Sequence, residues 1–210
     1  MGMNRIIIGI SGCSASGKSF IVKYILDNLG EDIVSVLYQD NYYKKREQQV
    51  KDDKGNYNFD LPTSFHIDQL IDDIKKIKNG EVVIRNEYTF NNPDVIPKKI
   101  IVKPKPIVLV EGLFLFDNSD LSSLFDKKIF IDSKIDTMID RRIKRDYKIR
   151  GYDKDDVIYK FKNHVIPAYK KYIFPHKDYS DLIVNNNINQ LQGAETTLDY
   201  IKKDYVLNNK

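Results

Sequence analysis

Cysteine is almost absent from this chain, since Cys13 is the only one among its 210 residues. A single cysteine excludes an internal disulfide and is typical of proteins from a reducing compartment. No stretch approaches the roughly 18 consecutive apolar residues of a membrane span, and the first apolar run begins near the start of the sequence. We therefore expect neither a membrane partner nor a signal peptide, and a cytoplasmic location.

An excess of positive charge is also nearly lacking, because 34 Lys and Arg residues face 30 Asp and Glu residues, for a formal charge of +4. A dedicated nucleic-acid binder usually has a stronger, clustered excess, so we expect no nucleic-acid partner. The length and the apolar fraction of 41% allow a sizeable core, and no repeat or linker divides the chain. This predicts a single domain over residues 1–210.

The strongest positive feature is residues 12–19, which read Gly-Cys-Ser-Ala-Ser-Gly-Lys-Ser and directly follow an apolar run. This is the G-x-x-x-x-G-K-[ST] pattern of a phosphate-binding loop between a buried strand and an amphipathic helix; the alternative is a plain Gly/Ser turn. The glycines permit backbone N–H groups to converge on phosphate oxygens, Lys18 adds a charge for the outer phosphates, and Ser19 is placed to bind Mg²⁺. The expected ligand is ATP or GTP with Mg²⁺. The predicted phosphate-binding residues are Gly12, Ser14, Ala15, Ser16, Gly17, Lys18 and Ser19.

Five short apolar runs alternate with segments of helical spacing. Nearly continuous apolar runs indicate strands covered on both faces, as in a parallel sheet. The pattern predicts an α/β fold with a five-stranded parallel sheet of the P-loop NTPase type, flanked by helices. The expected strands are 6–10, 33–37, 107–110, 128–131 and 181–184. The expected helices are 19–29, 66–79, 153–172 (bent near Pro167), one that starts at a capping box formed by Ser133 and Asp136, and a last helix with a frayed tail within 190–210.

Three segments are predicted to form a substrate loop, a hairpin and a lid in addition to the main sheet and its helices. Residues 41–62 are polar and aromatic and are predicted to form a substrate loop. Residues 81–102 alternate weakly around a turn signal, which predicts a small antiparallel β-hairpin outside the main sheet. Residues 141–156 are predicted to form an arginine-bearing helix and lid, with a hinge near Gly151.

Two carboxylates follow predicted strands at the edge where the phosphate loop lies. Asp40 comes just after the second strand and Glu111 just after the third. Ligands of open parallel sheets bind beyond the carboxyl ends of the strands. A kinase needs a carboxylate near Mg²⁺ and a base for the attacking hydroxyl. We predict Asp40 as the base and Ser19, Asp40 and Glu111 as metal-binding residues; turn or cap roles are the alternative.

The predicted arginine helix carries six basic side chains within ten residues. Cations on a solvated face near a helix C-terminus are the simpler interpretation, which we prefer for Lys144 and Lys148. Phosphoryl transfer needs cations against the charge that develops between donor and acceptor, and the planar guanidinium group matches phosphate oxygens. We therefore favour Arg142 and Arg145. The set is Arg141, Arg142, Lys144, Arg145, Lys148 and Arg150.

Taken together, these motifs resemble the uridine–cytidine kinases of the P-loop kinase superfamily over roughly residues 5 to 184. Besides the phosphate loop, the similar segments are Gln39-Asp40-Asn41-Tyr42-Tyr43, Asn58-Phe59-Asp60, Val110-Glu111-Gly112, the arginine helix at 141–146, and residues 178–184.

The resemblance implies a role for each matching residue. Asp40 would take the proton of a nucleoside 5′-hydroxyl, and Asp60 with Arg142 would hold the ribose hydroxyls. Lys18 and Arg145 would act on the phosphates during catalysis. Aromatic residues would line the nucleoside pocket, although core packing is nearly as good an interpretation for two of them, Phe59 and Phe90; the set is Tyr43, Phe59, Tyr88 and Phe90. The family also implies a homo-oligomer, a tetramer built partly through the hairpin.

Three positions depart from the family pattern. Pro93, Tyr152 and Lys160 stand where the family has side chains that read the base. Because hydrogen-bonded readout rejects analogues, a site without these groups should discriminate poorly between bases or accept another ring. Uridine or cytidine is the default acceptor; a sugar phosphate, a vitamin precursor or another nucleoside is the alternative. A nucleotide-binding regulator without turnover is a third hypothesis, which the intact Lys18, Ser19 and Asp40 oppose.

Two further interpretations are simple ones. The three histidines, His66, His164 and His176, are expected to have surface or capping roles. A GTPase switch is disfavoured, because the only Asp-x-x-Gly match, at residues 52–55, has no predicted strand before it.

Overall fold

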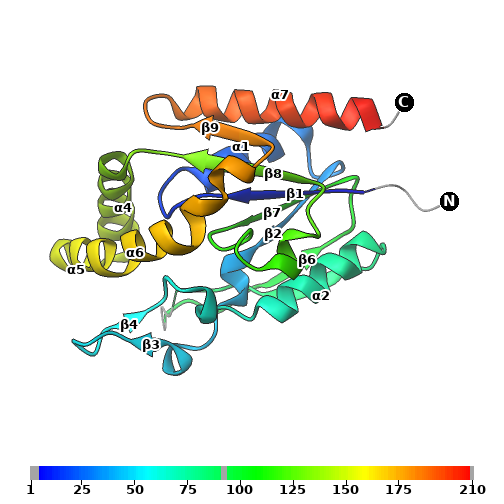
Figure 1. Cartoon of the computed structure of the whole chain (residues 1–210). Helices are drawn as coiled ribbons and strands as arrows, with labels where there is room; N and C mark the ends of the chain where they lie inside the picture. The colour runs from blue at the N-terminus through cyan, green and yellow to red at the C-terminus, as the bar shows by residue number, and fades with distance from the viewer. Residues whose placement is uncertain (1–4, 91–93, 209–210) are drawn as a thin grey trace.

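The computed structural model describes residues 5–90 and 94–208, and its centre is a five-stranded parallel sheet (Figure 1). The strands are β1 (Ile6–Ser11), β2 (Val34–Tyr38), β7 (Ile107–Gly112), β8 (Lys127–Asp132) and β9 (Leu182–Asn185), in the order β2-β7-β1-β8-β9. All four pairings between neighbours are parallel. The predicted fold class and its five strands are confirmed.

Helices cover both faces of the sheet, which explains why the strands are apolar on successive residues. Side chains alternate between faces along a strand. Ile8 and Ile10 of β1 pack against α1 (Lys18–Leu29) and α7 (Gln190–Asn208), whereas Ile7 packs against α2 (Ile67–Lys78) on the opposite face. Figure 1 shows α1 and α7 above the sheet and α2 below it.

A third apolar cluster attaches a helical arm to the carboxyl-terminal edge of the sheet. The arm consists of α4 (Ile135–Arg150), α5 (Lys154–Lys160) and α6 (Ile166–Ala168), with π-helical turns at Phe161–Val165 and Tyr169–Ile173. Pro167 lies between the two π-helical turns, and because proline lacks an N–H, it interrupts regular helical bonding. The predicted bent helix is therefore confirmed. The cluster includes Cys13, Phe130, Met138, Phe161, Val165 and Tyr169.

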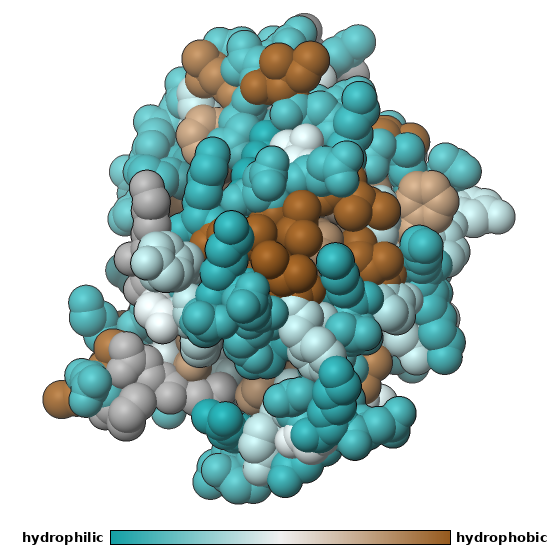
Figure 2. Space-filling model, turned by 90° about the vertical axis from the view of Figure 1, so that its left-hand side faces the viewer, coloured by the Kyte–Doolittle hydropathy of each residue, from teal (hydrophilic) through white to brown (hydrophobic). Residues whose placement is uncertain are grey.

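Figure 2 looks onto the side of the molecule where this arm lies and shows mainly polar side chains around a central apolar patch.

Elsewhere the chain forms the short helix α3 (Ser119–Ser122). Within residues 5–90 and 94–208, no helix has both the length and the apolar character needed to cross a membrane.

Two small hairpins lie outside the main sheet. β5 (Val83–Asn86) and β6 (Lys99–Val102) pair antiparallel, which confirms the predicted hairpin. A second hairpin, β3 (Val50–Lys51) with β4 (Tyr57–Asn58), lies in the segment predicted as loop. A strand therefore does precede Asp52, contrary to the prediction. The sequence signal was missed because each of these strands is only two residues long.

Candidate active site

A cavity of about 470 Å³ lies at the carboxyl-terminal edge of the sheet. Every candidate site residue except Gly12 and Ser16 lines it. They come from the phosphate loop and the start of α1, the end of β7, α4, and the segments that follow β2, β4 and β5. The roles assigned to these residues stay predictions, but the structure brings them to one place. The candidates that line it are Ser14, Ala15, Gly17, Lys18, Ser19, Asp40, Tyr43, Phe59, Asp60, Tyr88, Phe90, Glu111, Arg142 and Arg145.

The phosphate loop includes residues with left-handed backbone conformation, both glycine and non-glycine. Gly17 has φ 104° and Ala15 has φ 62°, both in the left-handed region. Lys18 begins α1, and its Nζ donates to the carbonyls of Gly12 and Cys13, each at 3.0 Å. The same Nζ lies 3.7 Å from Glu111 Oε1. The ammonium group is therefore held inside the loop, next to the positive end of α1.

A buried polar network supports the loop from behind. The Ser16 carbonyl accepts hydrogen bonds from Ser133 Oγ at 3.1 Å, Arg141 at 3.2 Å and Asn186 Nδ2 at 2.7 Å. Ser133 does not cap α4, because its buried hydroxyl donates to the carbonyls of Ser16 and Asn186, and Lys134 takes the N-cap position. The predicted capping box is therefore wrong. Sequence analysis named Arg141 only as part of the basic helix and missed Asn186, and both support the loop.

This network makes a prediction for Gly17→Ala. A Cβ at Gly17 would lie 2.1 Å from Asn186 Nδ2, and an alanine at φ 104° is strained. Strain of about 1–3 kcal/mol would oppose the loop conformation that binds phosphate. This corresponds to about 5- to 150-fold weaker nucleotide binding. Titration calorimetry with ATP measures the loss. Gly30→Ala is the matched control, because Gly30 also has a positive φ (82°) but has nothing within 4 Å; equal losses in both variants would contradict the expectation.

The two strand-end carboxylates lie next to each other, because β2 and β7 are neighbours and Tyr38 pairs with Glu111 in register. Burial raises the pKa of Glu111 above its usual value; the charge of Lys18 lowers this pKa, and that of Asp40 raises it. Asp40 is in the short 3₁₀ helix Gln39–Tyr42 directly after β2. Gln39 fixes this turn, since its Oε1 accepts from the backbone N–H groups of Leu113 and Phe114.

The carboxylates and Ser19 fit a magnesium ion. Ser19 Oγ donates to Glu111 Oε2 at 3.4 Å, and both residues line the cavity with Asp40. In the part of the chain that the structure describes, no group of three or more His, Cys, Asp or Glu side chains is placed to hold a metal alone. Mg²⁺ keeps several waters and substrate oxygens and needs only one or two carboxylates, so this oxygen donor set is sufficient.

Aromatic rings form the wall opposite the phosphate loop. Tyr43 stacks at 4.7 Å on Tyr88, which meets Phe90 at 5.1 Å, and Phe59 lies 6.0 Å from Tyr43. Neither Phe59 nor Phe90 is part of the buried core, so core packing does not explain them. Burial raises the pKa of Tyr43 well above its usual value, and the charges of Asp40 and Asp60 raise it further.

One arginine connects the aromatic side of the cavity to the phosphate loop. Arg142 donates to Ser14 Oγ at 3.0 Å and lies 3.6 Å from Asp60 Oδ1. Arg142 forms an ion pair with Asp146, with 3.2 Å between Nε and Oδ2, and Arg145 Nε donates a hydrogen bond to Asp146 Oδ1 at 2.8 Å. Asp146 is buried and was missed, although its i,i+4 spacing from Arg142 signals such a pair.

Two of the three positions that depart from the family pattern lie at this cavity. Tyr152 and Lys160 both line the cavity, and Lys160 pairs with Asp156 at 2.8 Å. Pro93 lies outside the described residues.

The simple interpretation of the histidines is wrong for His164. Its side chain is buried at the cavity and its Nε2 lies 2.8 Å from Asp52 Oδ2. It falls on the buried side of a π-helical turn, which helical periodicity does not anticipate. His66 occupies the N-cap of α2 without a side-chain capping bond, and His176 is partly exposed, 3.6 Å from Asp117.

Known proteins resemble this chain over most of its length. A uridine kinase of Chlamydia pneumoniae is 38% identical over 189 residues, which cover 90% of this chain and 85% of that protein. A uridine kinase of Staphylococcus haemolyticus (strain JCSC1435) is 36% identical over 181 residues, 86% of this chain and 87% of that one. Phosphoribulokinase from Rhodobacter spheroides shares the fold, with a TM-score of 0.63, 17% identity, and coverage of 90% and 73% of the two chains.

The family model described as "Phosphoribulokinase / Uridine kinase family" matches residues 7–191. This range contains every candidate site residue and all of the five-stranded sheet except Ile6, the first residue of β1. With the phosphate loop, the strand-end carboxylates and relatives of this identity, the chain belongs to the phosphoribulokinase/uridine kinase family and is a P-loop phosphotransferase.

Proposed function

We propose that the chain transfers the γ-phosphate of ATP or GTP to the 5′-hydroxyl of a nucleoside, with uridine or cytidine as the default acceptor. The observation that carries this proposal is the pair of Asp60 and Arg142, 3.6 Å apart, in the same cavity as Asp40 and the phosphate loop. A carboxylate accepts two vicinal hydroxyl hydrogens, and a guanidinium group donates to their oxygens. The names of the similar proteins, which are uridine kinases, support the same acceptor.

The proposed reaction is an in-line displacement. The Asp40 carboxylate accepts the proton of the acceptor hydroxyl as its oxygen forms a bond to the γ-phosphorus, and the bond from that phosphorus to the bridging oxygen breaks to release the nucleoside diphosphate. Lys18, Arg142 and Arg145 stabilise the charge that develops on the transferred group. When bound, Mg²⁺ would neutralise phosphate charge, and Ser19, Glu111 and Asp40 are the residues that would hold it.

A second acceptor class follows from the part of the cavity wall that Tyr152 and Lys160 line. Lys160 is engaged with Asp156 and lies under the Tyr152 ring at 5.7 Å, so the base-reading groups of the family are replaced by a charged pair and a phenol. Such a wall suits another polar hydroxyl acceptor, such as a sugar phosphate, a vitamin precursor or a different nucleoside.

A direct assay separates these acceptors. Purified protein with Mg²⁺ and either ATP or GTP is given millimolar nucleosides, sugar phosphates and vitamin precursors, and the phosphorylated products are identified by mass spectrometry. We expect uridine or cytidine 5′-phosphate to form fastest. No nucleoside 5′-phosphate with any donor would reject the nucleoside proposal, and faster turnover of another hydroxyl compound would favour the second class.

We also propose that the chain acts as one cytoplasmic kinase domain in a homo-oligomer, a tetramer by family resemblance. The β5–β6 hairpin leaves Ile84 and Ile101 60% and 59% exposed, and an interface between subunits would cover these two adjacent, paired side chains. Light scattering after gel filtration reports the assembly; a monomer at micromolar concentration would reject this part.

A further inference from the structure

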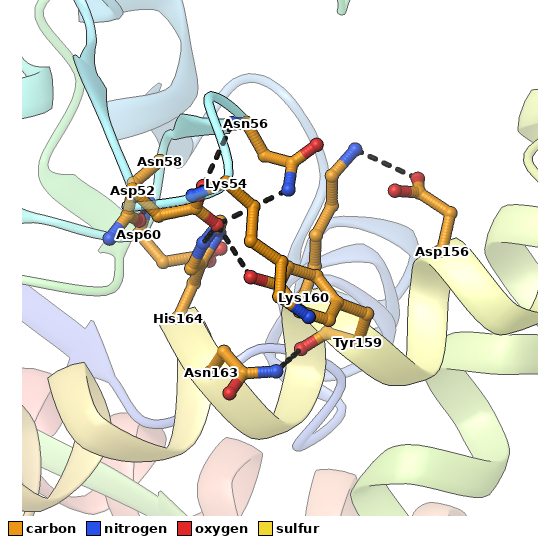
Figure 3. Close-up of polar contacts among 10 residues, drawn as sticks. All are labelled: Asp52, Lys54, Asn56, Asn58, Asp60, Asp156, Tyr159, Lys160, Asn163 and His164. Carbon is orange, nitrogen blue, oxygen red and sulfur yellow. Dashed lines mark hydrogen bonds and ion pairs between the residues drawn. The ribbon is translucent and has the colours of Figure 1, made fainter.

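The carboxylate of Asp52 lies outside the proposed catalytic set and is surrounded by donors (Figure 3). Its Oδ2 receives hydrogen bonds from Tyr159 OH at 2.9 Å and Asn56 Nδ2 at 3.3 Å, and lies 2.8 Å from His164 Nε2. Its Oδ1 accepts from the backbone N–H groups of Lys54 and Asn56, at 3.0 and 2.8 Å. One carboxylate thus orders its own turn and also binds two side chains of the helical arm.

The turn that Asp52 orders leads directly to the proposed acceptor site. Asp52 follows β3, and the chain returns through β4, whose residues Tyr57 and Asn58 pair with β3. Asn58 Oδ1 then accepts from the backbone N–H of Asp60 at 2.9 Å. The position of Asp60 is therefore coupled through a short, hydrogen-bonded segment to the position of Asp52.

On the side of the arm, His164 is the buried partner. Its side chain is 2% exposed, while its Nδ1 has no hydrogen-bond partner among the described residues. A buried ring nitrogen without a hydrogen-bond partner lowers the stability of the fold. If this position only filled space in the core, an apolar side chain would therefore be more stable there. The ring also lies on a π-helical turn, a feature frequent at functional sites.

The two sides also attract each other electrostatically. Desolvation opposes ionisation of Asp52, but hydrogen bonds from His164, Asn56 and Tyr159 outweigh it and hold the pKa of this carboxyl well below its usual range. The ammonium group of Lys54, in the same turn, lies 4.7 Å from the centre of the Tyr159 ring. The contact between the hairpin and the arm therefore includes an ionised acceptor and a cation–π interaction.

We propose that His164 is a positioning residue: by donating from Nε2 to Asp52, it holds the β3–β4 hairpin against the helical arm and thereby places Asp60 opposite Arg142. The expected effect of His164 on kinetics rests on the proposed function, in which Asp60 and Arg142 bind the acceptor. The donor nucleotide is bound by the phosphate loop, on the other side of the cavity. His164 should accordingly affect acceptor binding and leave nucleotide binding unchanged.

Two substitutions separate the hydrogen bond from the ring. His164→Phe keeps a flat ring but removes the donor, whereas His164→Gln keeps an amide donor near the position of Nε2. In His164→Phe we expect the acceptor KM to rise about tenfold or more, as for the loss of a hydrogen bond to a charged group, with an unchanged KM for ATP. We expect faster amide hydrogen exchange across residues 50–60. His164→Gln should restore both properties substantially.

Further variants keep the test decisive. Tyr159→Phe removes a second donor to Asp52 without altering a buried position, so it should change the same two properties in the same direction even if His164→Phe does not fold. Asn163→Ala is the matched control: Asn163 is next to His164, and its side chain donates to the carbonyl of Tyr159 on its own helix, away from Asp52.

The outcomes that overturn the proposal are specific. They are equal effects of Gln and Phe at position 164, an equal rise in the KM for ATP, or unchanged hydrogen exchange over residues 50–60 in both His164→Phe and Tyr159→Phe. If the wild-type chain phosphorylates no nucleoside, the proposed function fails, whereas the exchange measurement still decides whether His164 holds the hairpin.

Discussion

Asp40→Asn should lower kcat by about 10²- to 10⁴-fold, the range expected when a general base is removed. Asp40 lies in the cavity with Lys18 and Ser19, and its charge acts on Glu111 on one side and Tyr43 on the other. It is therefore placed between the phosphate loop and the aromatic wall, where an acceptor hydroxyl would meet the γ-phosphate. Steady-state kinetics with the acceptor found in the product assay measure the effect.

The same variant distinguishes catalysis from folding. Asparagine has nearly the same shape as aspartate, so the melting temperature and the binding of ATP should stay close to those of the wild type. Asp27→Asn is a matched control, since Asp27 is an exposed carboxylate paired with Lys23 on α1. A kcat within a few-fold of the wild type for Asp40→Asn would remove the proposed base, because a general base contributes at least about 10²-fold.

The features predicted correctly are those that a short, contiguous pattern determines. The run Ile107–Val110 is buried on both faces, which requires a central strand, and the hairpin at 81–102 alternates because only one of its faces contacts α2. The phosphate loop needs its glycines and its lysine within eight residues. For such features, local sequence and tertiary structure favour the same conformation.

The features missed depend on contacts between distant segments. Ser133 has the spacing of a helix cap, yet its hydroxyl donates to Ser16, which lies 117 residues away. His164 bonds to Asp52 at a separation of 112 residues, and a π-helical turn changes which side of the arm it faces. Local propensity carries no information on such partners, because tertiary packing selects them.

The environment of Lys18 leads to the second large prediction, because this residue is proposed to bind the phosphates and also contacts a buried carboxylate. Its side chain is 6% exposed and lies 3.7 Å from Glu111, which is also buried. Burial raises the pKa of Glu111 from its ordinary value of 4.5, and the charge of Lys18 opposes that rise. The folded protein therefore binds this proton more tightly than the unfolded chain does. Stability contributed by the protonated form is lost as pH rises through the folded pKa.

Lys18→Met should accordingly lower kcat by about 10²- to 10³-fold, as for loss of one group that stabilises transition-state charge, and should also destabilise the fold in a pH-dependent way. Without Lys18 the pKa of Glu111 rises further, so the loss of unfolding free energy relative to the wild type should be small near pH 5 and grow toward pH 8. There it should approach about 3–5 kcal/mol, as for a broken buried ion pair. Thermal unfolding over this pH range measures it. Adding Glu111→Gln should abolish the pH dependence but leave kcat low. A deficit that is constant with pH, or that persists in the double variant, would mean that Lys18 does not neutralise Glu111 and that its charge is available to the phosphates alone.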